Sequence, residues 1–267
     1  MGRQMGISGH PRALRAVIFA GLGLSMAWFG PAPAVAAGTL TASAAPDPIE
    51  RSAEPFGLFA SHLAGGGLLA KWQGVQRRLD DEMVQLALCE GDPDRCASPA
   101  ALQFLAIVDV AKARDGRARL GEINRAINLA IRPMGDFEQY GEIDVWSSPL
   151  ATLTRGAGDC EDYAIAKFIA LQRAGVSPDD LRIVIMRDTI RGEDHAVAAA
   201  RLDGQWLTLD NRRMAMVADA QVRNYRPSFV LDRGGVKRYQ EAPMPMLGER
   251  NLVSQAPGHA EIRISPM

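Results

Sequence analysis

Three side chains in this sequence, Cys160, His195 and Asp210, have the types and the chain order of a nucleophile, a general base and an orienting acid. A thiolate attacks a carbonyl carbon, an imidazole takes the thiol proton and later protonates a leaving amine, and a carboxylate fixes the imidazole tautomer. The combination predicts nucleophilic catalysis at an amide bond. The three residues are separated in the chain, so the elements that carry them must bring them together.

Cys160 is predicted to open a helix. It follows the glycine-containing turn at 156–158, apolar residues then recur at helical spacing, and Gly175 marks the end. A helix N-terminus offers free N–H groups and a partial positive charge, which favour a thiolate over a thiol. The alternative for Cys160 taken alone is a core thiol, because free cysteine is among the most buried residue types.

The remaining elements follow from the hydrophobic period and from turn residues. Helices are predicted from Leu68, from Ser98-Pro99, over 120–131 and from Cys160, with a loop over 134–157. Strands are predicted at 183–185, 195–202 and 205–210. Several helices followed by an antiparallel sheet define an α+β fold, with the helices packed on the sheet.

The last two predicted strands form a hairpin that places Asp210 beside His195. With Asp203-Gly204 as a two-residue turn, Leu202 pairs with Gln205, and Asp210 then lies within about two ladder positions of His195. A single strand histidine is usually structural, and a single aspartate at a strand end usually forms a turn. Both together, after a helix-start cysteine, favour a Cys-His-Asp triad.

Acidic residues surround the cysteine: Asp159, Glu161 and Asp162 are its near neighbours. Uncompensated anions raise the pKa of a thiol and oppose catalysis, whereas a calcium ion bound by their oxygens would cancel the charge. The alternative is that these acids cap the helix and interact with its dipole. Trp146, ahead of this helix, has two candidate roles: a wall of the substrate cleft, near the oxyanion site, or a member of the core.

The chain divides into four predicted segments. Residues 1–36 have three arginines, no acid, an apolar run from Ala16 to Phe29 and small residues up to Ala36, which is the pattern of a secretory signal peptide. The alternative, an uncleaved membrane anchor, needs about 20 apolar residues. The other segments are a flexible leader at 37–66, the folded domain at 67–230 and a loosely ordered C-terminal tail at 231–267.

Composition limits the classes of function. Of the 267 residues, 47% are hydrophobic and 23% are charged, which suits a globular protein with a core. A formal net charge of -1 gives no electrostatic support for nucleic-acid binding, and no nucleic-acid partner is expected. Of the three cysteines, Cys89 and Cys96 flank a short loop around Pro93. In an oxidising compartment they are predicted to form a disulfide, the alternative being two free thiols.

The residues around the triad resemble a known family. The strings GDCEDYAIAK at 158–167, DHAV at 194–197 and WLTLDN at 206–211 are similar to those of the bacterial transglutaminase-like cysteine proteinases, and within them to the LapG-type periplasmic adhesin proteases. The resemblance covers about 68–227 and implies a papain-like triad on a transglutaminase-type α+β core. It implies Cys160 as nucleophile, His195 as general base and acid, and Asp210 as the orienting carboxylate.

The resemblance also implies calcium dependence, with Asp159 and Glu161 as calcium-linked residues. It implies cleavage of a large surface adhesin near its N-terminus, and restraint by an inner-membrane receptor that senses cyclic di-GMP. The expected function is a periplasmic, calcium-dependent cysteine endopeptidase that controls biofilm attachment. Two alternatives stay open: an envelope transglutaminase or other acyl transferase with the same triad, and a binding module without catalysis.

Overall fold

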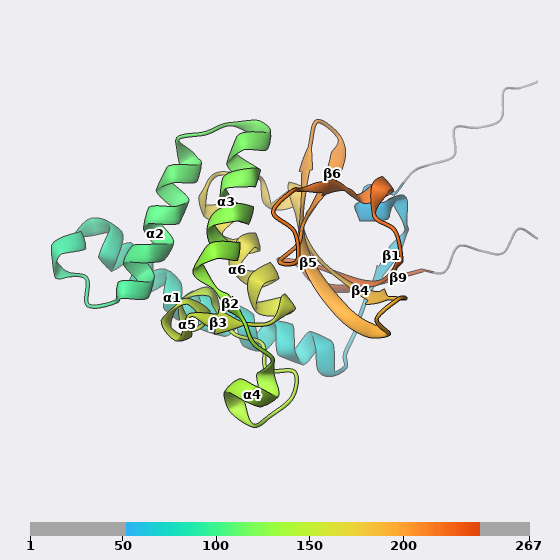
Figure 1. Ribbon diagram of the computed structural model, residues 1–267, viewed down its shortest axis with the longest axis horizontal. Coiled ribbons are helices and arrows are strands. Elements are labelled where there is room, and N and C mark those ends of the chain that lie inside the picture. Colours follow the sequence, from blue (N-terminus) through green and yellow to red (C-terminus); the bar gives the residue numbers. More distant parts are fainter. Residues whose placement is uncertain (1–51, 241–267) are drawn as a thin grey trace, which may run out of the picture. The chain divides into compact units, whose positions relative to one another are not determined.

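A computed structural model describes residues 52–240 of the chain (Figure 1). The predicted signal peptide, most of the predicted leader and the sequence after residue 240 lie outside the described residues. Within 52–240, helices pack on an antiparallel sheet, which is the α+β fold expected from the sequence. The helices found in this range are all too short or too polar to cross a bilayer.

Six α-helices occur in residues 52–240, and α6 lies between other helices and the sheet. The helices are α1 (Gly67–Gly91), α2 (Pro99–Lys112), α3 (Gly116–Ala130), α4 (Asp136–Tyr140), α5 (Pro149–Arg155) and α6 (Cys160–Arg173). Residues 161–171 of α6 are all buried, because α2, α3 and α5 pack around it and β4 and β5 cover its remaining face. A helix that is buried on every side is a rigid support for the residue at its start.

Two of these helices lie where the sequence analysis predicts a loop. α4 and α5 both fall within 134–157, and this part of the prediction is wrong. α5 starts with Pro149 after Ser148, the same Ser-Pro signal that correctly marks the start of α2, and it ends at Gly156 with a φ of 68°. The helix is only 7 residues long, so its hydrophobic period is too short to be recognised.

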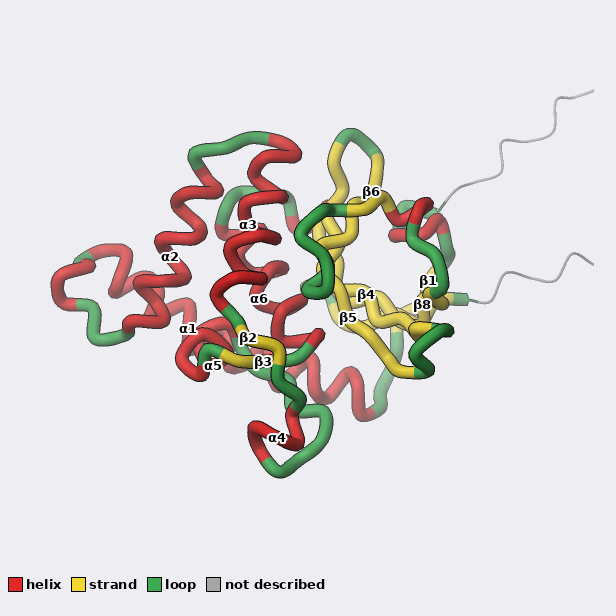
Figure 2. Tube along the Cα trace, in the orientation of Figure 1, coloured by secondary structure: helices red, strands yellow, loops and turns green. Residues whose placement is uncertain are grey.

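Within the described residues the main sheet, drawn in yellow in Figure 2, has seven antiparallel strands. Their order is β1-β9-β8-β4-β5-β6-β7. The strands are β1 (Ala60–His62), β4 (Leu181–Asp188), β5 (Glu193–Leu202), β6 (Gln205–Leu209), β7 (Val217–Ala218), β8 (Tyr225–Asp232) and β9 (Gly235–Tyr239). The hairpin register is the predicted one: Leu202 pairs with Gln205 and Ala198 with Leu209. A separate parallel pair joins β2 (Arg132–Pro133) to β3 (Ala157–Gly158).

The sheet extends past the predicted domain boundaries at both ends. β1 lies in the segment 37–66 predicted as a leader, and β9 lies in the segment 231–267 predicted as a tail. These two strands pair with each other, and Glu54 accepts hydrogen bonds from Arg182 and from Lys237 beside them. Both strands are short and depend on partners distant in the chain, so the local pattern does not reveal them.

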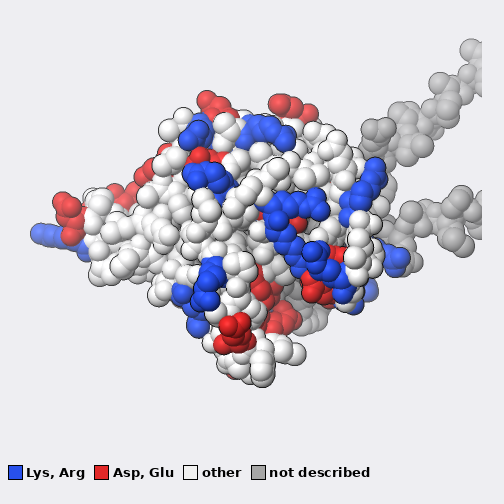
Figure 3. Space-filling view, in the orientation of Figure 1, with Lys and Arg blue, Asp and Glu red and all other residues white. Residues whose placement is uncertain are grey.

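Surface charges of opposite sign are interspersed on the visible face of the molecule (Figure 3). Exposed ion pairs of the described residues include Arg212 with Glu193 and Arg187 with Asp194. Exposed pairs of this kind contribute little to stability, about 0–1 kcal/mol each.

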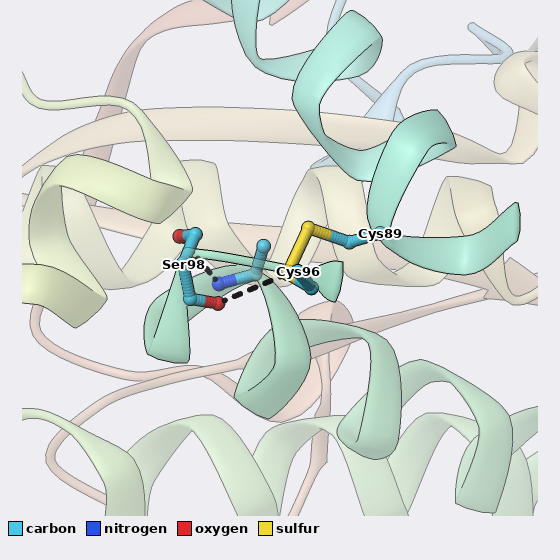
Figure 4. The surroundings of a disulfide bond; sticks show 4 residues. Cys89, Cys96 and Ser98 are labelled. Atoms are coloured by element: carbon cyan, nitrogen blue, oxygen red, sulfur yellow. Dashed lines mark hydrogen bonds between the residues drawn. A yellow bond between two sulfur atoms is a disulfide. The ribbon is translucent and has the colours of Figure 1, made fainter. Parts of the chain in front are cut away.

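The disulfide predicted between Cys89 and Cys96 is present (Figure 4). It links the end of α1 to the turn before α2, where Ser98 Oγ accepts from the N–H of Ala101 and caps α2. Cys160 is the remaining cysteine and is free. The covalent link and the cap therefore fix the α1–α2 connection without engaging the candidate nucleophile.

Removing this disulfide is expected to lower stability. In the chain-entropy account, a loop as short as the one between Cys89 and Cys96 is worth about 2–3 kcal/mol. The double variant Cys89→Ala/Cys96→Ala should lose about that much free energy of unfolding, measured by denaturant titration, while alkylation of Cys160 keeps its wild-type rate. An unchanged unfolding midpoint would show that the bond contributes nothing to the fold.

Candidate active site

Cys160 is the first residue of α6, as the sequence predicts. Its side chain is partly buried, and the backbone N–H of Ala196 in β5 contacts the thiol. The thiol donates a hydrogen bond to Glu161 Oε2 at 3.2 Å. The cysteine therefore lies where α6 meets β5, beside the residue that follows His195.

His195 and Asp210 form a buried pair. His195 Nε2 lies 2.9 Å from Asp210 Oδ1, and the two residues are only 1% and 7% exposed. The predicted hairpin register produces this contact, because β6 ends at Leu209 opposite Ala198. Nδ1 of His195 has no hydrogen-bond partner among the described residues. The imidazole is thus anchored by one nitrogen and has the other available.

The carboxylate of Asp210 is held in place by its own loop. Oδ1 also accepts from the N–H of Arg212 at 3.0 Å, and the carbonyl of Asp210 accepts from Asn128 Nδ2 at 3.1 Å. Burial raises the pKa of Asp210, but the hydrogen bond and charge of His195 outweigh it, so the pKa is lowered. Asp210 is therefore ionised near neutral pH and suited to fix the imidazole tautomer.

The acidic cluster beside the thiol has a member that the sequence analysis missed. Oxygen atoms of Asp136, Asp159 and Glu161 all lie within 4.8 Å of one another. β2 and β3 run parallel with Pro133 opposite Gly158, so the residues that follow the two strands meet at the same edge. A single acid at the start of a five-residue helix gives no signal of this pairing.

The cluster suits a hard divalent cation. One carboxylate oxygen of Asp136 and one of Asp159 are buried without a hydrogen-bond partner among the described residues. Burial raises the pKa of Asp159 to about 9, with Glu161 adding to the rise, and burial also raises the pKa of Glu161. Buried carboxylates in contact cannot all stay ionised without a compensating charge. Oxygen ligands of this kind are those that calcium prefers.

The structure does not favour the helix-cap explanation for Asp159. Although Asp159 is the residue before α6, its side chain makes no cap hydrogen bond. Asp162 has a structural role instead: its Oδ1 accepts from the N–H of Ser147 at 2.8 Å. The Asp162 side chain also lies close to the backbone of Gly158. A Cβ at position 158 would lie 2.7 Å from Asp162 Oδ2, so this position requires glycine.

Trp146 is mainly a core residue that also lines an open groove. It is 7% exposed, and its Nε1 donates to Asp144 Oδ1 at 2.8 Å. The groove is also lined by Lys71, Arg78, Tyr140 and Arg155. The connection to the cysteine helix runs through the neighbouring Ser147, which donates to Asp162. Trp146 therefore supports the segment that precedes the site.

Comparison with known families identifies the chain. The sequence profile of the bacterial transglutaminase-like cysteine proteinases (BTLCP) matches residues 82–229, which is more than half of the chain. The chain belongs to this family. The matched range contains all three residues of the candidate triad. The curated proteins include no significant match to the proteinase.

Solved structures resemble this BTLCP proteinase at low identity. LapG of Legionella pneumophila is 21% identical, with a TM-score of 0.49, over 58% of this chain and 86% of that chain. A calcium-bound form of that protein is 23% identical, with a TM-score of 0.48, over 55% and 82% of the two chains. An EGTA-treated form is 22% identical, with a TM-score of 0.49, over 58% and 84%.

The acidic cluster opposes ionisation of the thiol in this proteinase. Burial raises the pKa of Cys160, and the neighbouring charge of Glu161 raises it further. Glu161 also holds the thiol proton through its hydrogen bond, so the thiol is directed toward an acid rather than toward His195. Glu161 therefore disfavours the thiolate form of Cys160 both by its charge and by its hydrogen bond.

Proposed function

We propose that this proteinase is an exported, calcium-dependent cysteine endopeptidase with the triad Cys160, His195 and Asp210. The observation that carries the proposal is the buried hydrogen bond between His195 and Asp210 beside the start of α6. It leaves His195 Nδ1 without a partner, next to Ala196, whose N–H contacts the thiol. These contacts support a triad made of a base, its orienting acid and a cysteine at a helix N-terminus.

In the proposed reaction, Cys160 transfers its thiol proton to His195 Nδ1, and the thiolate attacks the carbonyl carbon of the peptide bond. Asp210 accepts from Nε2–H throughout and stabilises the imidazolium ion. The N–H of Cys160, free at the start of α6, is positioned to donate to the oxyanion. His195 Nδ1–H then protonates the leaving amine, and water deprotonated by the same nitrogen hydrolyses the thioester.

Asp136, Asp159 and Glu161 would hold the calcium ion. When bound, calcium supplies the positive charge that these buried carboxylates lack. A Glu161 carboxylate that binds calcium is a weaker hydrogen-bond acceptor for the thiol than an unbound one. It also raises the pKa of Cys160 less. The thiol of Cys160 is then free to turn toward His195 Nδ1.

The proposed substrate is the N-terminal region of a large cell-surface adhesin, whose cleavage would control biofilm attachment. The proposed inhibitory partner is an inner-membrane receptor for cyclic di-GMP, and the proposed compartment is the periplasm. The resemblance of the strings at 158–167, 194–197 and 206–211, family membership and the signal-peptide pattern at 1–36 support these assignments.

Overproduction of the wild-type protein in its own bacterium is expected to release an adhesin fragment with a new N-terminus. Mass spectrometry of proteins released from the outer membrane would identify the fragment and the cleavage position. The Cys160→Ala variant, produced at the same level, should release none. A cross-linked or amine-tagged product in place of a new N-terminus would show that the reaction is acyl transfer.

A further inference from the structure

Lys167 is a buried cation that the mechanism above does not use. It is fully buried, on α6, about two helical turns after Cys160 and on the same face. Its Nζ donates to the carbonyl of Leu209 at 3.2 Å, and Leu209 is the residue before Asp210. The same nitrogen lies 5.7 Å from the ring centroid of Tyr163. The helix α6 therefore carries Cys160 at its start and, two turns later, an ammonium group that binds the residue next to Asp210.

Stability alone does not account for a lysine at this position. An ammonium group has three donors, and the carbonyl of Leu209 is the one acceptor found for it within residues 52–240. Burial lowers the pKa of Lys167 to about 7, while the negative charge of Asp210 opposes the fall. An apolar side chain of similar volume would avoid this desolvation and is often neutral or stabilising in such places.

A second cation close to Asp210 is engaged by other acids. Arg212 donates its backbone N–H to Asp210, but its guanidinium group forms ion pairs with Asp188 and Glu193. Lys167 has no carboxylate partner at ion-pair distance among the described residues. Its charge, which lowers the pKa of Asp210, is therefore directed at the acid of the triad.

We propose that Lys167 is the positioning residue of the His195–Asp210 pair. Its ammonium group holds the end of β6 through the carbonyl of Leu209 and presents a positive charge to Asp210. The carboxylate stays ionised and directed at His195 Nε2, and Nδ1 keeps the lone pair that accepts the thiol proton. This inference rests on the proposed triad.

The test uses the rate at which iodoacetamide alkylates Cys160 in the full chain, followed by mass spectrometry, because the other two cysteines are in a disulfide. Lys167→Met, in calcium-containing buffer, should react about tenfold more slowly than wild type, because the imidazole is no longer held in the one tautomer whose Nδ1 accepts the thiol proton. Its melting temperature should be unchanged or higher. Nitrogen-15 NMR of labelled histidine, with the signal assigned by His195→Ala, should show one tautomer in the wild type and a mixture in Lys167→Met.

A neutral control separates charge from hydrogen bonding. Asn128→Ala removes a hydrogen bond to the carbonyl of Asp210 without changing charge, and it should keep a single tautomer. Lys167→Gln keeps a donor for Leu209 without the charge, and it should behave like Lys167→Met. If Lys167→Met does not fold, Lys167→Gln answers the same question.

Two results would overturn the inference in different ways. Wild-type alkylation with a single tautomer in Lys167→Met or Lys167→Gln would show that Lys167 is merely structural, and the triad would stand. Equal alkylation rates in the wild type and His195→Ala would show that His195 does not act on Cys160. The basis of this inference would then be lost.

Discussion

Replacing Cys160 with alanine is expected to abolish peptide cleavage and to leave the fold intact. The sulfur is the attacking atom in the proposed reaction, and removing the nucleophile of a triad lowers turnover on the order of 10⁴-fold or more. Alanine is the best helix former, and the buried surface of α6 begins only after Cys160. Cleavage assays and a thermal melt on the same preparation would measure both effects.

The matched control is a variant that loses sulfur atoms away from the active site. Cys89→Ala/Cys96→Ala lacks two sulfur atoms at the α1–α2 connection and should cleave at the wild-type rate once folded. His195→Ala should resemble Cys160→Ala, while Asp210→Asn should retain the geometry and lose less activity. Turnover by Cys160→Ala at the wild-type rate would end the assignment of the nucleophile.

Chelating calcium is expected to abolish cleavage, and magnesium is not expected to restore it. Calcium accepts six to eight oxygen ligands in flexible geometry, whereas magnesium demands a tight octahedron and retains its water. Asp136→Ala, Asp159→Ala and Glu161→Ala should each raise the calcium concentration needed for half-maximal activity. Asp144→Asn is the matched control, because this neighbouring acid pairs with Lys71 outside the cluster.

Calcium removal should also change how stability depends on pH. The folded-state pKa of Asp159 is raised from 3.8 to about 9, so the folded protein binds more protons than the unfolded chain between those values. Stability without calcium should therefore fall as pH rises through this window, and calcium should reduce the fall. The helix-cap alternative instead forecasts a loss of about 0.5–2 kcal/mol in Asp159→Ala with no calcium dependence. Full activity in a strong chelator would contradict the calcium role.

Local signals in the sequence predict the triad side of the site well. The two-residue turn at Asp203-Gly204 fixes the register of β5 and β6, and that register alone places Asp210 near His195. The helix start at Cys160 follows from the glycine turn and from the apolar spacing after it. Each of these signals lies within a few residues of the feature that it predicts.

Features that depend on long-range pairing escape the same reasoning. Asp136 joins Asp159 only because β2 and β3, two residues each, pair across more than twenty positions. Lys167 looks like an ordinary solvated helix residue until the end of β6 is packed against it. The period of a sequence reports which face is apolar, but not which distant segment covers that face.

The pairing of β1 with β9 has a consequence for the order of folding. Lys237 reaches Glu54 across 183 positions, whereas α6 and the strands β4 to β6 that complete the triad are neighbours in the chain. Local contacts form before contacts that close long loops. The catalytic half is therefore expected to assemble first, with the edge of β9 that pairs with β1 still open. During that interval, an unpaired strand edge is available to other chains, so the last step of folding is also the one most exposed to aggregation.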